Sequence, residues 1–549
     1  MHLNKNIKVF CIVSFIIINL IFIFKSYGNF PGKKILYINL FVICNLYIFY
    51  SFNFSKLFLD KTLSIFLWLG FFYKLSIMLI TDSRLAEGAG SFKYQPNQYD
   101  ELLIFSIIGI AGFFISSIFF NKIIVKIFKL QPNLSEEKYE ILKNFYDKKK
   151  KLIYILFFFL IIFITFINYN FGFYQKGLLP KAEINLYLGY IIKWMLLFGL
   201  TSISCLLIDY EIRTSNKIGS IVIFLFFTEL LLTNLSLLSR SLIFTGSAVL
   251  FSVYINYENS LKKKTLYNSL IFNTILLLII FSISIFPINK IRNYQFIDQS
   301  FIAEKIVENY SKSQTEEELL KKKDLIEIKN DDLAQVNIED KKNVQSIVES
   351  NLNKEEKIKL IEENLESRGI SNLDLKKNIN RILFVIKNRF VGLDGVASVT
   401  SYPNTNINLL TKSLKEKFNP NVYGFYQRTF IIPYEQPHLV NQNYIKTSSR
   451  HYGIIIPGII SYLSYPGSKL FLFISISLIF IFCGTLEFIA KKLTYNSILF
   501  SSLVGYVLGY RLIHFGYLPR QSYLLIGAIV LTIMIIYLTK KIIILLYEK

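Results

Sequence analysis

Apolar runs of membrane-spanning length recur along almost the whole of this 549-residue chain, and they constrain its fold more than any other feature. A helix needs about 20 apolar residues to cross the hydrocarbon core of a bilayer. Runs of about this length lie near 8–24, 35–54, 62–80, 101–120, 152–169, 186–208, 218–238, 242–257, 267–287, 468–490, 496–517 and 521–545. The sequence therefore predicts an all-α polytopic membrane protein with about 12 transmembrane helices.

The composition and the placement of charge exclude several other classes of protein. Hydrophobic residues make up 53% of the chain and charged residues only 18%, unlike a soluble, collagen-like or disordered protein. The net charge of +23 does not indicate nucleic acid as a partner, because residues 289–452 hold 25 basic and 22 acidic side chains and the surplus lies in short connections and span ends. No disulfide framework or zinc site is expected, since the four cysteines fall inside apolar runs: Cys11, Cys44, Cys205 and Cys483.

Lysine-rich connections predict which side of the membrane each loop occupies. With the N-terminus inside, the cytoplasmic loops carry Lys148 to Lys151, Lys262 to Lys264, Lys491 with Lys492, and Lys540 with Lys541. The first run lacks a cleavage site and is interpreted as a retained signal anchor. One further run, Gly453 to Tyr465, is too short to cross and contains Pro457-Gly458. We expect it to be a re-entrant or interfacial segment on the outer side.

A long charged segment separates the ninth run from the tenth. The expected organisation is therefore transmembrane helices 1 to 9 over 1–288, an extracytoplasmic domain over 289–452, and the short segment with helices 10 to 12 over 453–549. Capping signals predict helices that open near Thr315, Asn353 and Ser371, so this insert is expected to be mostly helical. From about Arg389 the sequence turns to Gly, Asn, Tyr and Pro, which is typical of loops that carry functional sites.

Five ionisable residues fall inside or at the end of apolar runs, where an unpaired charge is costly. The predicted topology places all of them between the middle of the bilayer and its outer boundary: Lys74, Lys193, Glu229, Arg240 and Arg511. A polar stripe follows one face of the seventh run and should face the bundle interior: Glu229, Thr233, Ser236 and Arg240. The alternatives are that the two lysines extend to the headgroups and that Glu229 pairs with one cation for structure alone.

Cations gathered at the outer leaflet favour an anionic ligand. Guanidinium groups bind phosphate or diphosphate through two parallel hydrogen bonds. Two phosphates on a lipid tail, presented at the outer leaflet, describe a polyprenyl-diphosphate-linked sugar. The substrate is therefore expected to be a polyprenyl-diphosphate-linked oligosaccharide within membrane lipid.

The architecture of nearly the whole chain resembles the Wzy-type O-antigen polymerases and their relatives, the O-antigen ligases. The features that carry the resemblance are the number of spans, the large outer loop late in the chain, Ser239-Arg240-Ser241, and the stretch from Gly453 to Pro457-Gly458. The resemblance implies a GT-C-like glycosyltransferase of the bacterial inner membrane. It would join lipid-linked repeat units on the periplasmic face without a metal or cofactor during surface polysaccharide and lipopolysaccharide biosynthesis. The charged segment 300–380 departs from the family pattern.

The resemblance also suggests roles for individual residues. Arg240 and Arg450 would bind the diphosphate, and His451 resembles the loop histidine of the ligase branch. Arg511 would share the neutralisation of charge on the leaving group. The base that takes the proton of the acceptor hydroxyl is left open among His451, Asp394 and Glu435. The other candidate substrate-binding residues are Arg389, Arg428, Lys74, Lys193 and Glu229, with Tyr423, Tyr426 and Tyr452 as sugar platforms or simply as the core of the loop.

Two alternative functions remain open from the sequence. A ligase would transfer finished glycan to a different acceptor, and a flippase would move the same lipid-linked sugar across the membrane. A flippase should line its path through both leaflets, whereas the intramembrane charges of this chain lie in the outer half. A chain-length regulator and a flippase are the expected protein partners.

Overall fold

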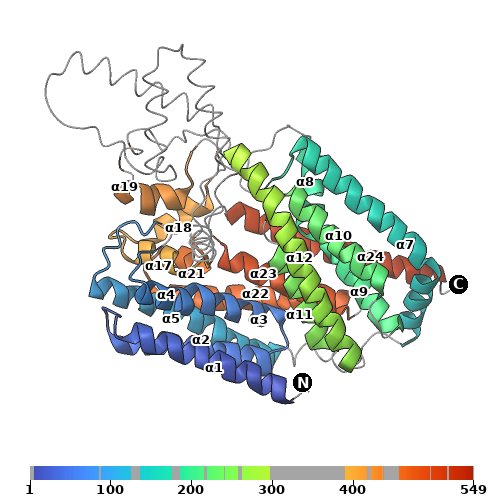
Figure 1. Cartoon of the computed structure of the whole chain (residues 1–549). Helices are drawn as coiled ribbons and strands as arrows, with labels where there is room; N and C mark the ends of the chain where they lie inside the picture. The colour runs from blue at the N-terminus through green and yellow to red at the C-terminus, as the bar shows by residue number, and fades with distance from the viewer. Residues whose placement is uncertain are drawn as a thin grey trace, which may run out of the picture. The chain divides into compact units, whose positions relative to one another are not determined.

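The structure is a computed structural model, and all regular elements of its described residues are helices (Figure 1). It describes residues 5–85, 88–124, 136–175, 186–215, 219–239, 242–257, 263–296, 390–416, 419, 422–435, 437, 440, 457–494, 496–515 and 519–547. The chain divides into two compact units, one of residues 1–286 with 384–549 and one of residues 287–383. The helices expected near Thr315, Asn353 and Ser371 lie outside the described residues.

Each of the twelve apolar runs falls on a helix. Nine runs lie on single helices: α1 (Lys5–Tyr27), α2 (Lys34–Asn53), α7 (Glu136–Phe171), α10 (Ser220–Ser236), α11 (Leu242–Tyr257), α12 (Lys263–Phe296), α22 (Lys469–Leu493), α23 (Ile498–Ile513) and α24 (Pro519–Tyr547). The other three include π-helical turns: α5 (Pro96–Phe119) with η2 (Phe120–Ile124), α3 (Phe58–Leu67) with η1 (Trp68–Tyr73) and α4 (Lys74–Ile80), and α8 (Leu186–Trp194) with η3 (Met195–Gly199) and α9 (Leu200–Ser215).

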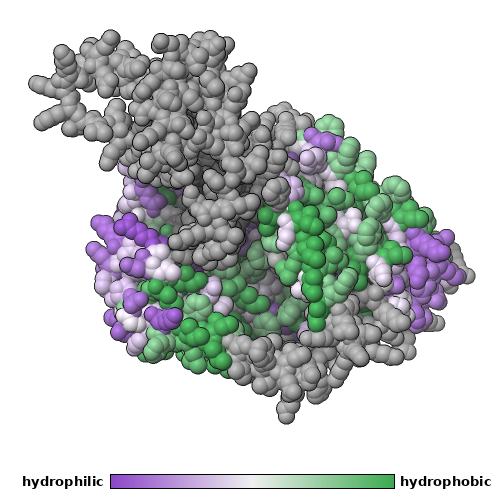
Figure 2. All heavy atoms as spheres, in the orientation of Figure 1, coloured by the Kyte–Doolittle hydropathy of each residue, from purple (hydrophilic) through white to green (hydrophobic). Residues whose placement is uncertain are grey.

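The helices are those of a multi-pass membrane protein. Seven helical stretches in the described residues are long and apolar enough to cross a membrane, and four further apolar helices are shorter. Phe159, Phe163 and Phe166 on α7 are 62%, 61% and 64% exposed, which suits contact with lipid. Figure 2 shows apolar side chains over the middle of the visible face and hydrophilic ones near the C-terminal end of the chain. The number of twelve crossings stays a prediction.

The segment after residue 389 is more ordered than the sequence suggested. Where an irregular loop was expected, it forms α17 (Leu393–Thr400), α18 (Ile407–Leu414) and η4 (Gln427–Ile431) with α19 (Ile432–Glu435). The short helix α21 (Ile459–Leu463) follows within the run from Gly453 to Tyr465. The segment after residue 389 also belongs to the same compact unit as the apolar helices, so the structure divides the predicted 289–452 insert at about residue 383. The expectation of an irregular loop was wrong because α17, whose small residues are buried, packs against α5.

Glycines let α17 and α21 enter deeply between the long helices. A Cβ on Gly70 would lie 2.3 Å from the carbonyl oxygen of Val391, so only glycine allows this approach. Gly70 is ten residues before the end of α4 at Ile80, which corresponds to about 15 Å along the helix. A Cβ on Gly395 would lie 2.1 Å from the carbonyl oxygen of Pro457, which joins the starts of the two short helices. The five residues of α21 cannot cross a membrane, in line with the expected re-entrant geometry.

Candidate functional site

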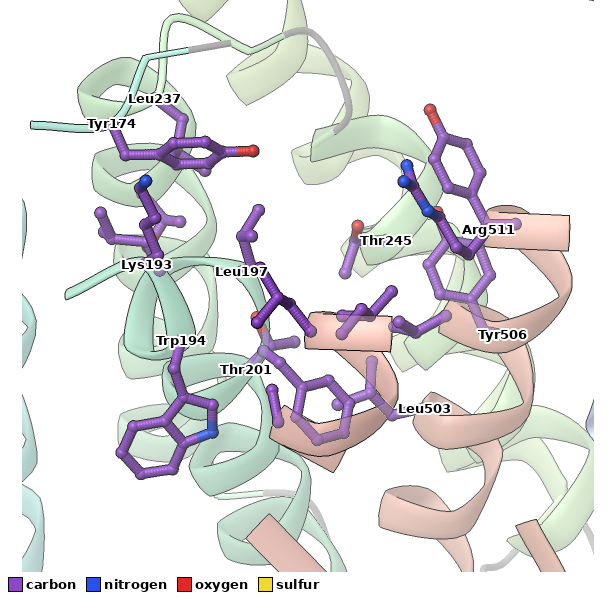
Figure 3. Close-up of a pocket in the computed structure, with 18 of the residues that line it drawn as sticks. Tyr174, Lys193, Trp194, Leu197, Thr201, Leu237, Thr245, Leu503, Tyr506 and Arg511 are labelled. Carbon is purple, nitrogen blue, oxygen red and sulfur yellow. The ribbon is translucent and has the colours of Figure 1, made fainter. Parts of the chain in front are cut away.

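One cavity of about 490 Å³ lies among α8, η3, α9, α10, α11, α23 and α24 (Figure 3). Its volume is in the range of small-molecule sites. Its lining includes three of the predicted site residues, Lys193, Glu229 and Arg511. Side chains from widely separated runs thus meet around one space, because the helices that carry them pack together.

The two cations of the cavity stand on opposite walls. Figure 3 shows Lys193 on the α8 side beneath Tyr174, and Arg511 on the α23 side. The Lys193 Nζ lies 5.4 Å from the centroid of the Tyr174 ring and 5.9 Å from that of Tyr190, as cation–π contacts require. Neither cation forms an ion pair with a residue in the described part of the chain. The described residues therefore leave both cations of the cavity without a directly paired carboxylate.

Arg511 is held on one side and free on the other. Its Nε donates a hydrogen bond of 2.9 Å to the Ser522 Oγ at the start of α24. Its Nη2 is buried and has no hydrogen-bond partner among the described residues. A buried donor without a partner costs about 1–3 kcal/mol, which a bound anion would recover. The fixed guanidinium is thus pre-organised for an acceptor that enters the cavity.

Glu229 lines the cavity, and its side chain is completely buried. Its Oε1 accepts hydrogen bonds from Thr201 Oγ1 at 3.0 Å and from Thr233 Oγ1 at 3.3 Å. Its Oε2 has no partner among the residues that the structure describes. The described members of the expected polar stripe, Glu229, Thr233 and Ser236, are all buried and so face the bundle interior, as the sequence indicated. Glu229 also forms no ion pair with a cation in the described part of the chain, so the alternative of a purely structural pairing with one cation is not seen there.

Lys74 and Asp394 pair with each other instead of lining the cavity. The Lys74 Nζ forms an ion pair with Asp394 and donates a hydrogen bond of 3.1 Å to the Phe390 carbonyl oxygen. Both side chains are 4% exposed, so Lys74 does not extend to the headgroups. Neither residue belongs to the lining of the cavity. The pair joins α4 to the start of α17, and its evident role is to position that helix.

Arg428 and Glu435 also hold segments of the chain together. The Arg428 Nη2 lies 2.8 Å from the Glu416 Oε1, which also accepts a hydrogen bond from the Phe425 N–H at 2.7 Å. Burial raises the pKa of Glu416, and Arg428 opposes that shift. The Glu435 Oε1 accepts a hydrogen bond of 2.8 Å from the Gly90 N–H. Both contacts fasten the segment 416–435 and lie outside the cavity lining.

The remaining predicted site residues have no described position. They are Arg240, Arg389, Arg450 and His451, together with Tyr452. Tyr426 is 3% exposed, and its hydroxyl lies 2.5 Å from the Ser398 Oγ. This favours the core interpretation of Tyr426 over that of a sugar platform.

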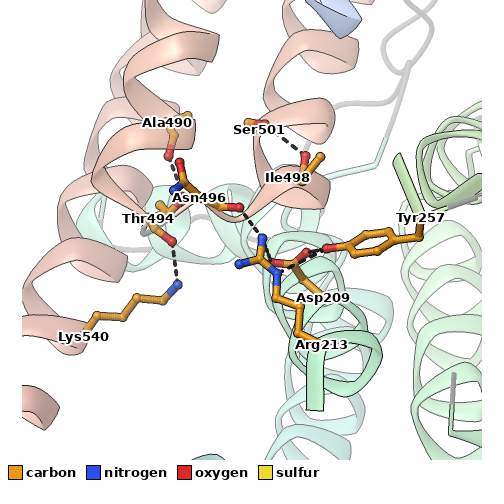
Figure 4. Close-up of polar contacts among 9 residues, drawn as sticks. All are labelled: Asp209, Arg213, Tyr257, Ala490, Thr494, Asn496, Ile498, Ser501 and Lys540. Carbon is orange, nitrogen blue, oxygen red and sulfur yellow. Dashed lines mark hydrogen bonds and ion pairs between the residues drawn. The ribbon is translucent and has the colours of Figure 1, made fainter. Parts of the chain in front are cut away.

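A buried polar network at the other end of the bundle was not foreseen from the sequence (Figure 4). Asp209 and Arg213 form an ion pair of 3.2 Å one turn apart on α9, and the Tyr257 hydroxyl donates to Asp209. Arg213 donates to the carbonyl oxygen of Asn496, and the Lys540 Nζ donates to that of Thr494 at 2.7 Å. The spacing of Asp209 and Arg213 was the available signal. These cations hold the turn between α22 and α23.

A second network surrounds the start of α3. Glu487 of α22 accepts hydrogen bonds from the backbone N–H groups of Phe58 at 2.7 Å and Leu59 at 2.9 Å. Asp60 accepts from the Tyr47 hydroxyl at 3.0 Å and from the Ser117 Oγ at 2.7 Å. A carboxylate at a helix N-terminus satisfies donors that the helix cannot pair itself. These carboxylates are therefore structural caps and clamps.

Comparison with known proteins adds no relative. The chain matches no protein-family model, and neither a curated protein nor a solved structure is detectably similar to it. The resemblance to O-antigen polymerases and ligases accordingly stays an expectation from the sequence. The function must be argued from the cavity itself.

Proposed function

We propose that the protein polymerises polyprenyl-diphosphate-linked oligosaccharide repeat units on the outer face of the bacterial inner membrane. It would act with about twelve spans and with the part of the predicted insert before residue 384 on the periplasmic side. The observation that carries the proposal is the cavity in which Lys193 and Arg511 stand on opposite walls without a described carboxylate partner. A diphosphate between them would neutralise both cations.

The apolar part of the cavity supports a substrate with a lipid tail. Among its lining residues, Ile191 of α8 is 51% exposed, and Leu524 and Leu531 of α24 are 47% and 50% exposed. The cavity therefore reaches the membrane-facing surface between α8 and α24. The Trp194 Nε1 donates a hydrogen bond of 2.8 Å to the Thr532 Oγ1 and joins these two helices. A polyprenyl chain could lie along this side while its diphosphate meets the cations.

The chemistry follows from the leaving group. A glycosyl diphosphate already departs readily, so the protein must neutralise the charge that develops on it and align the acceptor hydroxyl. Lys193 and Arg511 would supply the first effect. Removing one fixed electrostatic donor from such a site typically lowers the rate by about 10²–10³-fold.

The test is polymer formation by the purified full-length protein in lipid nanodiscs that contain only lipid-linked repeat units. The wild type should form a ladder, whereas Lys193→Ala and Arg511→Ala should each lower the rate by about 100-fold. Lys412→Ala is the matched control, because Lys412 is exposed on α18 and lies outside the cavity lining.

Disruption in the native host separates the rival activities. Loss of a polymerase leaves glycolipid capped with single repeat units, whereas loss of a ligase or a flippase leaves none. Two results together would refute the proposal. The purified wild-type protein would form no polymer from lipid-linked units, and disruption of its gene in the native host would remove all repeat units from the glycolipid.

A further inference from the structure

The environment of Glu229 differs from those of Asp394, Glu416 and Glu487. Asp394 is held by Lys74, Glu416 by Arg428 and Glu487 by two backbone N–H groups. Glu229 has only the two threonine hydroxyls, both on Oε1. It is also the one carboxylate in the lining of the cavity. A buried carboxylate oxygen that accepts no hydrogen bond is costly, so the two threonine contacts alone give no structural reason to keep Glu229.

The threonine contacts leave one oxygen available to a ligand. Thr201 of α9 and Thr233 of α10 approach the Oε1 from two different helices, which fixes the plane of the carboxylate. The Oε2 is buried and has no described partner. Figure 3 shows Thr201 below Lys193 on the same side of the cavity, and the carboxylate that Thr201 contacts lines that cavity together with both cations.

From this geometry we infer that Glu229 is the base that accepts the proton of the acceptor sugar hydroxyl. The inference rests on the proposed function and assigns the base to a residue outside the three candidates from the sequence, which were His451, Asp394 and Glu435. Asp394 and Glu435 are engaged elsewhere and do not line the cavity. The two cations and the carboxylate that line this cavity would bind the two reacting ends of one glycosyl transfer.

The proposed reaction transfers the donor sugar from its diphosphate to the acceptor hydroxyl in one displacement. The acceptor oxygen forms a bond to the anomeric carbon of the donor sugar while its proton passes to the Oε2 of Glu229. The bond between the anomeric carbon and the diphosphate oxygen breaks, and the diphosphate leaves with the electron pair. Lys193 and Arg511 neutralise the charge that the diphosphate gains, and the proton on Glu229 returns to solvent or to the released diphosphate.

Two substitutions of Glu229 distinguish a base from a structural carboxylate. Glu229→Gln keeps the size of the side chain and an oxygen that accepts the threonine hydrogen bonds, but it cannot take up the proton. Glu229→Asp keeps the base on a shorter side chain. If Glu229 is the base, Gln should lower the polymerisation rate by at least about 100-fold and Asp should retain more activity than Gln. A structural role predicts the reverse order, since Gln fits the site better.

The assay uses the full chain in nanodiscs and measures polymer formation, melting temperature and binding of polyprenyl diphosphate. Glu229→Gln should bind polyprenyl diphosphate within twofold of the wild type, which separates the loss of chemistry from a loss of binding. Thr532→Val, which removes only the hydroxyl that accepts from Trp194, is the control for altered packing beside the cavity.

Each outcome decides the inference. Three results for Glu229→Gln would each overturn the role of Glu229 as the base. The variant would polymerise at the wild-type rate, would be more active than Glu229→Asp, or would fail to fold. Loss of polymer in His451→Ala together with full activity in Glu229→Gln would assign the base to the histidine. A wild-type protein that forms no polymer refutes the proposed function itself, whatever the variants do.

Discussion

The buried pair of Lys74 and Asp394 gives a prediction whose magnitude follows from the structure. Both side chains are 4% exposed, so Lys74→Met leaves a buried carboxylate without its cation. Breaking such a pair by removing one partner costs about 3–5 kcal/mol. Lys74 also donates to the Phe390 carbonyl oxygen, so the variant loses a second contact at the start of α17.

Removal of both charges should cost much less than the sum of the two single changes. Replacement of a buried ion pair by apolar residues of similar volume is often neutral or stabilising by about 1–4 kcal/mol. The double variant Lys74→Met with Asp394→Leu should therefore unfold closer to the wild type than either single variant. The expected coupling energy is about 2 kcal/mol or more, within the range for residues in contact.

The assay is a double-mutant cycle of reversible unfolding in mixed detergent micelles, with polymer formation measured on the same samples. Because neither residue lines the cavity, the folded double variant should polymerise within a few-fold of the wild type. The buried-pair argument would be contradicted by two results together. The effects of the two single substitutions on the unfolding free energy would sum to that of the double variant, and Lys74→Met alone would lower it by less than about 1 kcal/mol. Loss of polymer in a stable double variant would show that one of the two residues acts in the reaction.

Three further changes test the packing around the site. Glu487→Ala should destabilise the protein by about 3 kcal/mol, because two buried N–H groups at the start of α3 lose their acceptor. Chemical denaturation measures this loss of unfolding free energy, and a change below about 0.5 kcal/mol would count against the capping role. Gly395→Ala should lower the unfolding free energy by about 1–3 kcal/mol, since the added Cβ would lie 2.1 Å from the Pro457 carbonyl oxygen. Proteolysis between α17 and α21 should become faster, and an unchanged melting temperature would refute the close approach. Arg428→Ala should lower the unfolding free energy by only about 1 kcal/mol, because the Arg428 side chain is 34% exposed and water partly screens its ion pair with Glu416. A decrease of more than about 3 kcal/mol would show that the pair is effectively buried.

The apolar helices were the most predictable part of the fold. Every run identified from the sequence coincides with a helix, because a stretch of about 20 apolar residues in lipid has hardly any other way to pair its backbone groups. The segment from Phe390 to Glu435 was less predictable. Its glycines were interpreted as loop residues, whereas Gly395 is needed for the close contact of α17 with Pro457. Sequence patterns do not reveal which distant backbone approaches a glycine.

The candidate site was foreseen only in part. Lys193, Glu229 and Arg511 were singled out because charge inside an apolar run is costly, and they line one cavity. The same rule also selected Lys74, but its partner Asp394 lies 320 residues further along the chain and could not be inferred. Asp209 and Lys540 were missed because they lie near span ends, where a charge is expected to be solvated, and yet both are buried.

Hydrophobic runs and their few internal charges were enough to predict a bundle of apolar helices. Both properties are local, since hydrophobicity and charge act on each segment wherever it packs. Which of those charges are paired within the protein and which face a cavity became clear only from the packing of the helices. Lys74 meets a carboxylate, whereas Lys193 and Arg511 meet a cavity. Pairing between charges depends on distances of a few ångströms between segments hundreds of residues apart, and those distances are set by helix packing.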